Sequence, residues 1–300
     1  MSAAAYRRWG VALAIIGTLV FSFRPILVKL VYVTYPPVSA VTLLFLRMSI
    51  SLPFFLVVAW WLRGDEPRLT RLDWMKVAAL GFIGYYAASF LDFIGLKYVG
   101  AGIGRLILYL YPTLVLLISF LFLHRHPTRR QLAALVITYA GVALILSSQA
   151  QAGAERRLFL LGALFVFASS LFYATYLVAG GELVKRIGSM RFTAYSMAVA
   201  TLPAVVQFFA LEPMSALELP DKVWLYAILL ATFTTVLPLF IQAEALKRIG
   251  AAEFALIGAL GPVSVAVTSA LGLDERFTLI QAVGGALVIL GVLLVSVKRN

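Results

Sequence analysis

Ten long apolar stretches constrain this chain more than any other feature of its sequence. They cover residues 9–30, 38–62, 74–97, 101–123, 130–147, 158–181, 191–211, 223–246, 251–272 and 278–297. A helix needs roughly 20 apolar residues to cross the hydrocarbon core of a bilayer, and each stretch is near that length. The apolar residues are continuous rather than alternating, which favours helices over barrel strands. The sequence therefore predicts an all-α polytopic membrane protein with ten transmembrane helices.

Composition agrees with membrane residence. Hydrophobic residues make up 62% of the 300 residues and charged residues only 13%, whereas soluble domains are about half apolar and a quarter charged. The chain has no cysteine, which excludes a disulfide scaffold, thiol catalysis and cysteine-based metal sites. The first stretch follows Arg7 and Arg8 as in a signal peptide, but no small-residue cleavage site comes after it. We expect it to be a retained first helix.

The distribution of charge predicts the orientation of the chain. Lys and Arg number 25 against 13 Asp and Glu, for a net charge of +12. With the N-terminus inside, 16 of the positive charges fall on inner connections and 6 on outer ones. Cytoplasmic loops carry such an excess. We therefore expect both termini in the cytoplasm and the chain in a bacterial inner membrane, with the lipid bilayer rather than nucleic acid as its partner.

The chain matches itself when it is shifted by 150 positions. Leu-Lys-Tyr-Val-Gly-Ala at 96–101 falls on Leu-Lys-Arg-Ile-Gly-Ala at 246–251. The same offset pairs Pro53 with Pro203, Trp74 with Trp224, Gln131 with Gln281, Pro112 with Pro262, and Gly141 with Gly291. We predict two repeats, 1–150 and 151–300, of five helices each. Because five is odd, the second repeat enters the membrane from the opposite side, as in secondary transporters. A duplicated but purely structural membrane protein is the alternative.

Several motifs resemble a known superfamily. They are Gly-Leu-Lys-Tyr-Val-Gly-Ala-Gly at 95–102, Ala-Leu-Lys-Arg-Ile-Gly-Ala-Ala at 245–252, the proline within each following helix, and Leu-Asp-Glu-Arg-Phe-Thr at 273–278. Together they resemble the drug/metabolite transporter superfamily, in particular its ten-helix EamA branch and, within that, YddG-type amino-acid exporters. The resemblance implies a central cavity between the first, third, fourth, sixth, eighth and ninth spans. The sequence departs from the family at His124-Arg125, so a role for Glu275 is not carried over to both halves. From the residues alone, we expect Glu275 to be a solvated loop acid.

Polar and aromatic residues recur at helical spacing near the middle of five of these spans, where a polar side chain is costly unless it faces the bundle interior. From these seams and their neighbours we predict the substrate cavity to include Ser22, Phe23, Tyr85, Tyr86, Ser89, Tyr109, Tyr111, Ser169, Tyr173, Tyr176, Thr235, Gln242 and Gly261. The alternatives for the six tyrosines are an interfacial belt, which their central position disfavours, and ordinary buried packing.

Three arginines lie inside spans: Arg24, Arg47 and Arg105. Asp92 and Arg105 flank the turn at Gly100 at similar depth, because a helix rises 1.5 Å per residue, so we predict a buried ion pair between them. The pair would be an outer gate, a proton-sensitive carboxylate or a static clamp on the hairpin. Arg24 would attract a substrate carboxylate or extend toward the membrane surface.

Prolines inside spans free a carbonyl from its usual hydrogen bond. Hinge candidates are Pro25, Pro112, Pro238 and Pro262. They would allow rocking between inward-open and outward-open states, or else form fixed kinks required by packing.

No motif for catalysis or cofactor binding is present. The sequence lacks a P-loop, its two histidines fall in one loop, and we predict neither an enzyme nor a cofactor or metal site. The leading hypothesis is a secondary transporter that exports small organic metabolites, first among them aromatic and other apolar amino acids. Its nearest rival is efflux of drugs or organic cations, since aromatic faces also accept cations. A membrane enzyme or a non-transporting scaffold is the hypothesis of another class. The sequence leaves the oligomeric state open, and a monomer is compatible with it.

Overall fold

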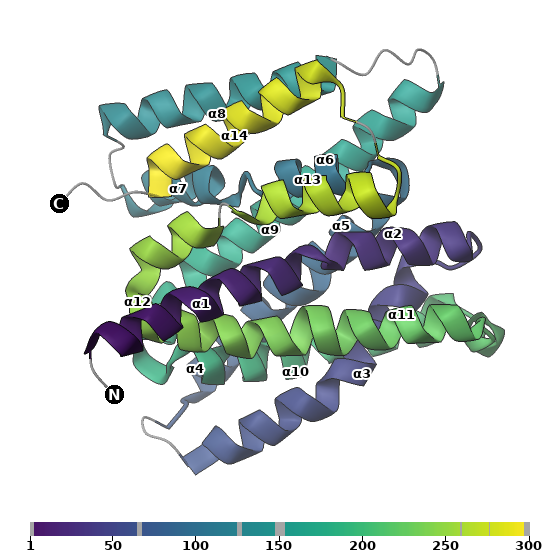
Figure 1. Cartoon of the computed structure of the whole chain (residues 1–300). Coiled ribbons are helices and arrows are strands. Elements are labelled where there is room, and N and C mark those ends of the chain that lie inside the picture. Colours follow the sequence, from purple (N-terminus) through teal and green to yellow (C-terminus); the bar gives the residue numbers. More distant parts are fainter. Residues whose placement is uncertain are drawn as a thin grey trace.

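The computed structural model describes residues 3–64, 68–124, 128–147, 154–258, 260–275 and 277–296, and every regular element among them is helical. In the first half the α-helices are α1 (Ala3–Ser22), α2 (Arg24–Thr34), α3 (Ala40–Trp61), α4 (Arg71–Gly81), α5 (Ala88–Tyr98), α6 (Ala101–Leu108), α7 (Tyr111–Leu123) and α8 (Arg129–Ser147). In the second half they are α9 (Ala154–Ile187), α10 (Ser189–Leu211), α11 (Asp221–Ala231), α12 (Leu237–Gly258), α13 (Leu260–Gly272) and α14 (Leu279–Ser296). Figure 1 shows their arrangement.

These helices are long and apolar enough to cross a membrane. Eight segments of the described chain meet that criterion, and two shorter apolar helices, Leu260–Gly272 and Leu279–Leu294, follow them. The prediction of an all-α polytopic membrane protein is confirmed, while the count of ten transmembrane helices stays a prediction. The predicted boundary between the repeats, at residue 150, and Arg125 and His126 lie outside the described residues.

The predicted end of the eighth span near residue 246 is wrong in detail. Helix α12 continues to Gly258, and α13 begins at Leu260. The segment in between contains no proline, and a single glycine such as Gly250 lowers helix stability by only about 1 kcal/mol.

Two of the backbone irregularities fall at equivalent positions in the two halves. Two π-helical turns, η2 (Phe82–Ala87) and η4 (Thr232–Val236), begin 150 residues apart. Likewise α6 ends at Leu108 and α12 at Gly258, each shortly before a proline of the matched pair Pro112 and Pro262. Both kinds of interruption loosen the hydrogen-bond ladder of a helix. The two halves therefore share these departures from ideal helix geometry as well as their matching residues.

Each hinge candidate lies just after such an irregularity. Pro25 and Pro112 occupy the first turns of α2 and α7, Pro238 is the second residue of α12 after η4, and Pro262 is the third residue of α13. Proline is accommodated at the start of a helix because its missing N–H has no partner there. The prolines thus mark the boundaries between short rigid helices, and their role as hinges stays a prediction.

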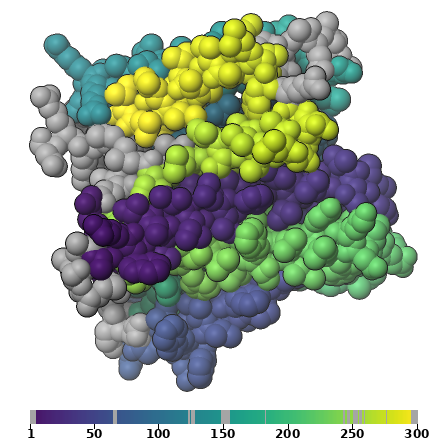
Figure 2. All heavy atoms as spheres, in the orientation of Figure 1, coloured from purple at the N-terminus to yellow at the C-terminus, as the bar shows by residue number. Residues whose placement is uncertain are grey.

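The helices of each half pack mainly against helices of the other half. The most extensive contacts are α8 with α14, α1 with α12, α5 with α9 and α3 with α10, and each of these pairs joins one helix of the first half to one of the second. Figure 1 shows α8 and α14 side by side. In the space-filling view α1 forms a continuous band against α13 (Figure 2). The interior between the halves is thereby enclosed mainly by α1, α3, α5, α6, α9, α10 and α12.

Carboxylates join the halves at two places. Asp73 completes a capping box with Thr70 at the start of α4 and forms an ion pair with Arg186 at the end of α9. Glu275 accepts hydrogen bonds from the backbone N–H groups of Ala101 (2.7 Å) and Gly102 (3.1 Å), the first residues of α6. The expectation that Glu275 is a solvated loop acid is wrong, because α6 presents unpaired amides and the positive end of its dipole to it.

Candidate functional site

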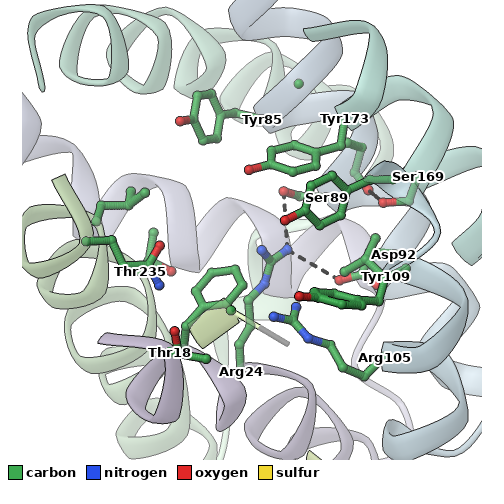
Figure 3. Close-up of a pocket in the computed structure, with 18 of the residues that line it drawn as sticks. Thr18, Arg24, Tyr85, Ser89, Asp92, Arg105, Tyr109, Ser169, Tyr173 and Thr235 are labelled. Carbon is green, nitrogen blue, oxygen red and sulfur yellow. Dashed lines mark hydrogen bonds and ion pairs between the residues drawn. The ribbon is translucent and has the colours of Figure 1, made fainter. Parts of the chain in front are cut away.

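A cavity of about 180 Å³ lies between the two halves. The side chains around it come from α1, α2, α3, α5, α6, α7, α9, α10 and α12 and from the two π-turns, and Figure 3 shows many of them. Its lining residues are Thr18, Phe21, Arg24, Arg47, Gly84, Tyr85, Ala88, Ser89, Asp92, Arg105, Leu108, Tyr109, Tyr111, Ser169, Tyr173, Met197, Thr235, Leu239, Gln242, Phe254 and Gly258. The cavity is therefore built from segments that are far apart in sequence.

Arg24 and Asp92 form the ion pair of this cavity. The guanidinium Nη2 of Arg24 donates to Asp92 Oδ2 at 3.4 Å and to Ser89 Oγ at 3.4 Å. Ser89 and Asp92 are three residues apart on α5, so they face the same side of that helix. Arg24 is the first residue of α2, directly after the interruption of the first span at Phe23. That interruption directs its side chain into the bundle, where Figure 3 shows it between Ser89 and Asp92.

The predicted ion pair between Asp92 and Arg105 is wrong in this structure. Asp92 is bonded to Arg24, and Arg105 lies beside the pair on the cavity wall (Figure 3). Similar depth on neighbouring helices brings the two residues close. It does not set the direction of their side chains, and the helix break at Phe23 supplies a competing cation. The gate, proton-sensitive and clamp hypotheses for Asp92 now apply to its pair with Arg24.

Two phenylalanine rings lie between the three guanidinium groups. Arg105 lies over Phe21 at 4.8 Å and Arg47 over Phe93 at 5.3 Å, while Arg24 is 5.9 Å from the first ring and 5.5 Å from the second. Cation–π contacts of this kind hold a guanidinium plane against a ring. Arg47 is only 2% exposed. The Nε atoms of all three arginines are buried without a hydrogen-bond partner.

A chain of tyrosines forms the aromatic wall of the cavity. Ring centroids are 5.7 Å apart for Tyr109 and Tyr111, 5.2 Å for Tyr111 and Tyr173, and 5.9 Å for Tyr173 and Tyr176. The hydroxyl of Tyr176 donates to that of Tyr85 at 3.1 Å. Such edge and offset contacts are the favoured aromatic geometries. The wall can accept an apolar body and, through its hydroxyls, a polar group.

Two predicted cavity tyrosines do not line it. Tyr86 is half-buried and packs between Phe82 and Phe90, because successive helical residues point about 100° apart and Tyr85 takes the inward direction. Tyr176 lies behind the wall, where it stacks on Phe192 at 5.4 Å. Tyr176 supports the lining tyrosines rather than facing the cavity.

Two residues predicted from the first span, Ser22 and Phe23, and one from the ninth, Gly261, also lie off the cavity. Ser22 donates to the carbonyl oxygen of Thr18 at 2.7 Å, and Phe23 is 40% exposed and faces Phe233. Gly261 backs onto Arg105, since an added Cβ would lie 3.4 Å from its Nη2. The seam that does face inward is Thr18, Phe21 and Arg24, at steps of three residues. That spacing would have identified Phe21, which the prediction missed.

Three of the predicted hydroxyl and amide residues, Ser169, Thr235 and Gln242, line the cavity, and each donates a hydrogen bond to a backbone carbonyl. Ser169 Oγ donates to Ala88 O at 2.6 Å, Thr235 Oγ1 to Leu230 O at 2.8 Å, and Gln242 Nε2 to Gly17 O at 3.1 Å. Each carbonyl belongs to a helix backbone. These side chains therefore donate to helix carbonyls, while the remaining lone pairs of their oxygens are available to accept bonds from a ligand.

Sequence reasoning missed Met197 and Phe254 as lining residues. Met197 belongs to α10, a helix with almost no polar periodicity, and Phe254 lies in the last turns of α12. An apolar lining residue has no signal that separates it from packing. Among the described residues, no three His, Asp or Glu side chains gather as metal ligands.

The Tyr85–Tyr176 bond permits a prediction about the wall. Tyr176→Phe keeps the ring stacking and removes one buried hydrogen bond, which we expect to cost about 1 kcal/mol of stability. Denaturation of the purified protein in mixed detergent measures it. Tyr226→Phe, in α11 away from the cavity, is the matched control, and we expect it to leave stability unchanged. Equal stability of Tyr176→Phe and wild type would show that the two hydroxyls are not bonded.

Comparison with known proteins gives a consistent set of relatives. The EamA-like transporter family matches residues 8–147 and again 160–297. An uncharacterised transporter of Bacillus subtilis, YcbK, is 31% identical over 285 residues, covering 92% of this chain and 88% of the relative. Another from that organism, YyaM, is 28% identical over 251 residues, covering 83% and 82%. A crystal structure with 18% identity superposes with a TM-score of 0.66 over 95% of this chain and 97% of the other, which shows a shared fold.

Proposed function

The chain belongs to the EamA-like transporter family, and we propose that it exports small organic metabolites, with aromatic and other apolar amino acids as the first candidates. It is a multi-pass membrane protein and a transporter by family. What we propose beyond that is the substrate class, the direction of transport and the mechanism of alternating access.

The observation that carries the proposal is the enclosed cavity, which combines an aromatic wall with a cluster of charges. Tyr111 and Tyr173 offer ring surface, while the charged group formed by Arg24, Asp92 and Arg105 lies on the same cavity. A substrate with an apolar body and a charged head fits both features at once. Ligand sites are typically apolar with a few convergent polar groups of this kind.

Alternating access is supported by the placement of the irregularities. The π-turns η2 and η4 and the interruptions before Pro112 and Pro262 occupy equivalent places in the two halves. In transporters built from repeats, exchange of conformation between the halves exposes a central site to one side and then the other. The positive charges of the inner loops orient the chain with its termini in the cytoplasm, which is the arrangement we propose.

Organic-cation efflux is the weaker candidate. The described residues of the cavity wall supply three guanidinium groups and one carboxylate, so a cationic ligand would enter a field of its own sign. The membrane-enzyme alternative would need clustered titratable groups to carry proton transfer, and Asp92, the acidic residue on the cavity, is bonded to Arg24.

Efflux from liposomes tests the proposal. Proteoliposomes are loaded with radiolabelled phenylalanine, tryptophan or leucine, and the protein is expected to accelerate their release relative to empty liposomes. The matched pair of variants is Tyr173→Ala, on the wall, and Tyr86→Ala, off the cavity. We expect Tyr173→Ala to slow efflux at least tenfold and Tyr86→Ala to change it less than twofold. Release of no amino acid by folded protein would refute the amino-acid proposal.

A further inference from the structure

The charges on the cavity do not balance. Arg24, Arg47 and Arg105 all line it, and Asp92 is the single acidic residue among the lining residues. The Arg24–Asp92 pair neutralises one guanidinium. Arg47 and Arg105 remain, and neither has an ion pair with a described carboxylate. Among the described residues, the lining of the cavity thus carries an excess of two positive charges.

The described protein groups leave part of the hydrogen-bonding capacity of these two arginines unused. Arg47 is 2% exposed, and among the described residues its Nη2 donates only a weak bond, to Met48 Sδ at 3.6 Å. Arg105 has a buried, unpartnered Nε and rests on the Phe21 ring. A ring face compensates a cation only in part, and buried charges are otherwise paired. The unpaired N–H groups at the cavity wall are those that an anionic ligand would satisfy.

We propose that the cavity recognises its substrate by a carboxylate group, bound by Arg105 and Arg47, and that it does not require a substrate amine. This inference rests on the proposed function and names the chemical group of the substrate that the site recognises. Arg24 is not assigned to the substrate, because its Nη2 already donates to Ser89 and Asp92. The guanidinium fork matches the geometry of a carboxylate.

The Arg24–Asp92 pair leaves the guanidiniums of Arg47 and Arg105 on the same cavity for the ligand, and both can hold one carboxylate. A substrate amine has no free acidic partner, since Asp92 is engaged by Arg24. The tyrosine wall then takes the apolar body. We therefore expect an aromatic carboxylate without an amine to bind at least as tightly as the corresponding amino acid.

Three ligands with the same phenyl ring separate these features. Phenylpyruvate has the carboxylate alone, phenylalanine has carboxylate and amine, and 2-phenylethylamine has the amine alone. Binding to the purified full-length protein is measured by calorimetry at constant ionic strength. Phenylpyruvate and phenylalanine are expected to bind within tenfold of each other, with phenylpyruvate no weaker, and 2-phenylethylamine at least 100-fold more weakly. Binding of 2-phenylethylamine as tight as that of phenylpyruvate, or of phenylalanine more than tenfold tighter than that of phenylpyruvate, would overturn the proposal.

Substitutions of Arg105 test where the carboxylate of the substrate binds. Arg105→Gln is expected to weaken phenylpyruvate binding at least tenfold, and Arg105→Lys, which keeps the charge but loses the fork, by a smaller factor. The control is Arg248→Gln, an arginine paired with Glu244 off the cavity (2.7 Å), which should leave affinity unchanged. Because Arg105→Lys retains the charge, it tests the site even where Arg105→Gln does not fold. Unaltered affinity in folded Arg105→Lys and Arg105→Gln would overturn the assignment.

The outcomes distinguish this inference from the proposed function. Carboxylates that bind as predicted but are not released from proteoliposomes would refute transport of these substrates and leave the recognition site in place. Release of 2-phenylethylamine but not of phenylpyruvate would refute carboxylate recognition and leave transport standing.

Discussion

Asp92→Asn is expected to destabilise the protein more than any other single substitution on the cavity, by about 3–5 kcal/mol. Asp92 is buried, with 5% of its surface exposed, and its carboxylate faces Arg24 at 3.4 Å. Removal of one partner from a buried pair leaves an uncompensated charge in a medium that solvates it poorly. Here the loss leaves three guanidinium groups, rather than one, around a neutral amide.

The reverse substitution should be milder. In Arg24→Gln the carboxylate keeps Arg105 and Arg47 on the same cavity, so its charge remains compensated. If Arg24 and Asp92 formed an isolated ion pair, either single substitution would lower the stability by a similar amount. In this cluster we expect the substitution of Asp92 to lower it more. Denaturation in mixed detergent of wild type, both single variants and the double variant Arg24→Gln/Asp92→Asn measures the coupling. We expect the double variant to be more stable than Asp92→Asn alone. Equal costs for the two single variants would contradict the shared-anion arrangement.

The same variants decide the role of Asp92 in transport. If the residue is a static clamp, Asp92→Asn protein that remains folded in liposomes transports with the pH dependence of wild type. If Asp92 exchanges a proton during the cycle, the variant loses that dependence, because an amide cannot be protonated near neutral pH. Efflux measured across a range of internal pH separates the two. Unchanged pH dependence would rule out coupling through this carboxylate.

The long apolar stretches predicted the overall fold, because a transmembrane helix must form its backbone hydrogen bonds within its own segment. Apolar length therefore indicates the helices directly, and the offset of 150 residues aligned even the π-turns at Phe82 and Thr232. The end of α12 was missed since nothing in the sequence around Gly250 forces a helix to stop.

Side-chain direction was harder to predict, and the errors have specific causes. A helical seam selects one face but does not say which of two adjacent residues, such as Tyr85 and Tyr86, points inward. The partner of Asp92 depended on a break at Phe23 that re-aims Arg24. Arg47 was recognised as an intramembrane cation, while its place on the cavity follows from how α3 packs against α5 and α10. In each case the direction of the side chain depended on tertiary packing, which the spacing of residues along one helix does not specify.

Gly284→Ala is the second substitution with a large expected effect, a loss of about 2–3 kcal/mol from overpacking. An added Cβ at Gly284 would lie 2.7 Å from the carbonyl oxygen of Gly141 and 2.7 Å from Cγ1 of Ile145. Conversely, a Cβ at Gly141 would lie 2.6 Å from the carbonyl oxygen of Gly284. A backbone atom cannot rotate away, so α8 and α14 would have to separate. Small residues permit such close approach of transmembrane helices.

The matched control is Gly181→Ala in α9, where a Cβ would meet no atom within 4 Å. Alanine favours the helix over glycine by up to about 1 kcal/mol, so this variant should be neutral or slightly stabilised, and the same gain is available at Gly284 before the clash is counted. Both variants gain the same helix propensity, yet Gly284→Ala should lower the stability and Gly181→Ala should not. Their comparison therefore separates the effect of the helix contact from that of helix propensity. Because Gly284 and Gly141 face each other, Gly141→Ala/Gly284→Ala should cost less than the sum of the single variants, since the first substitution already parts the helices. Additive costs in detergent denaturation would mean that the two glycines act at separate contacts.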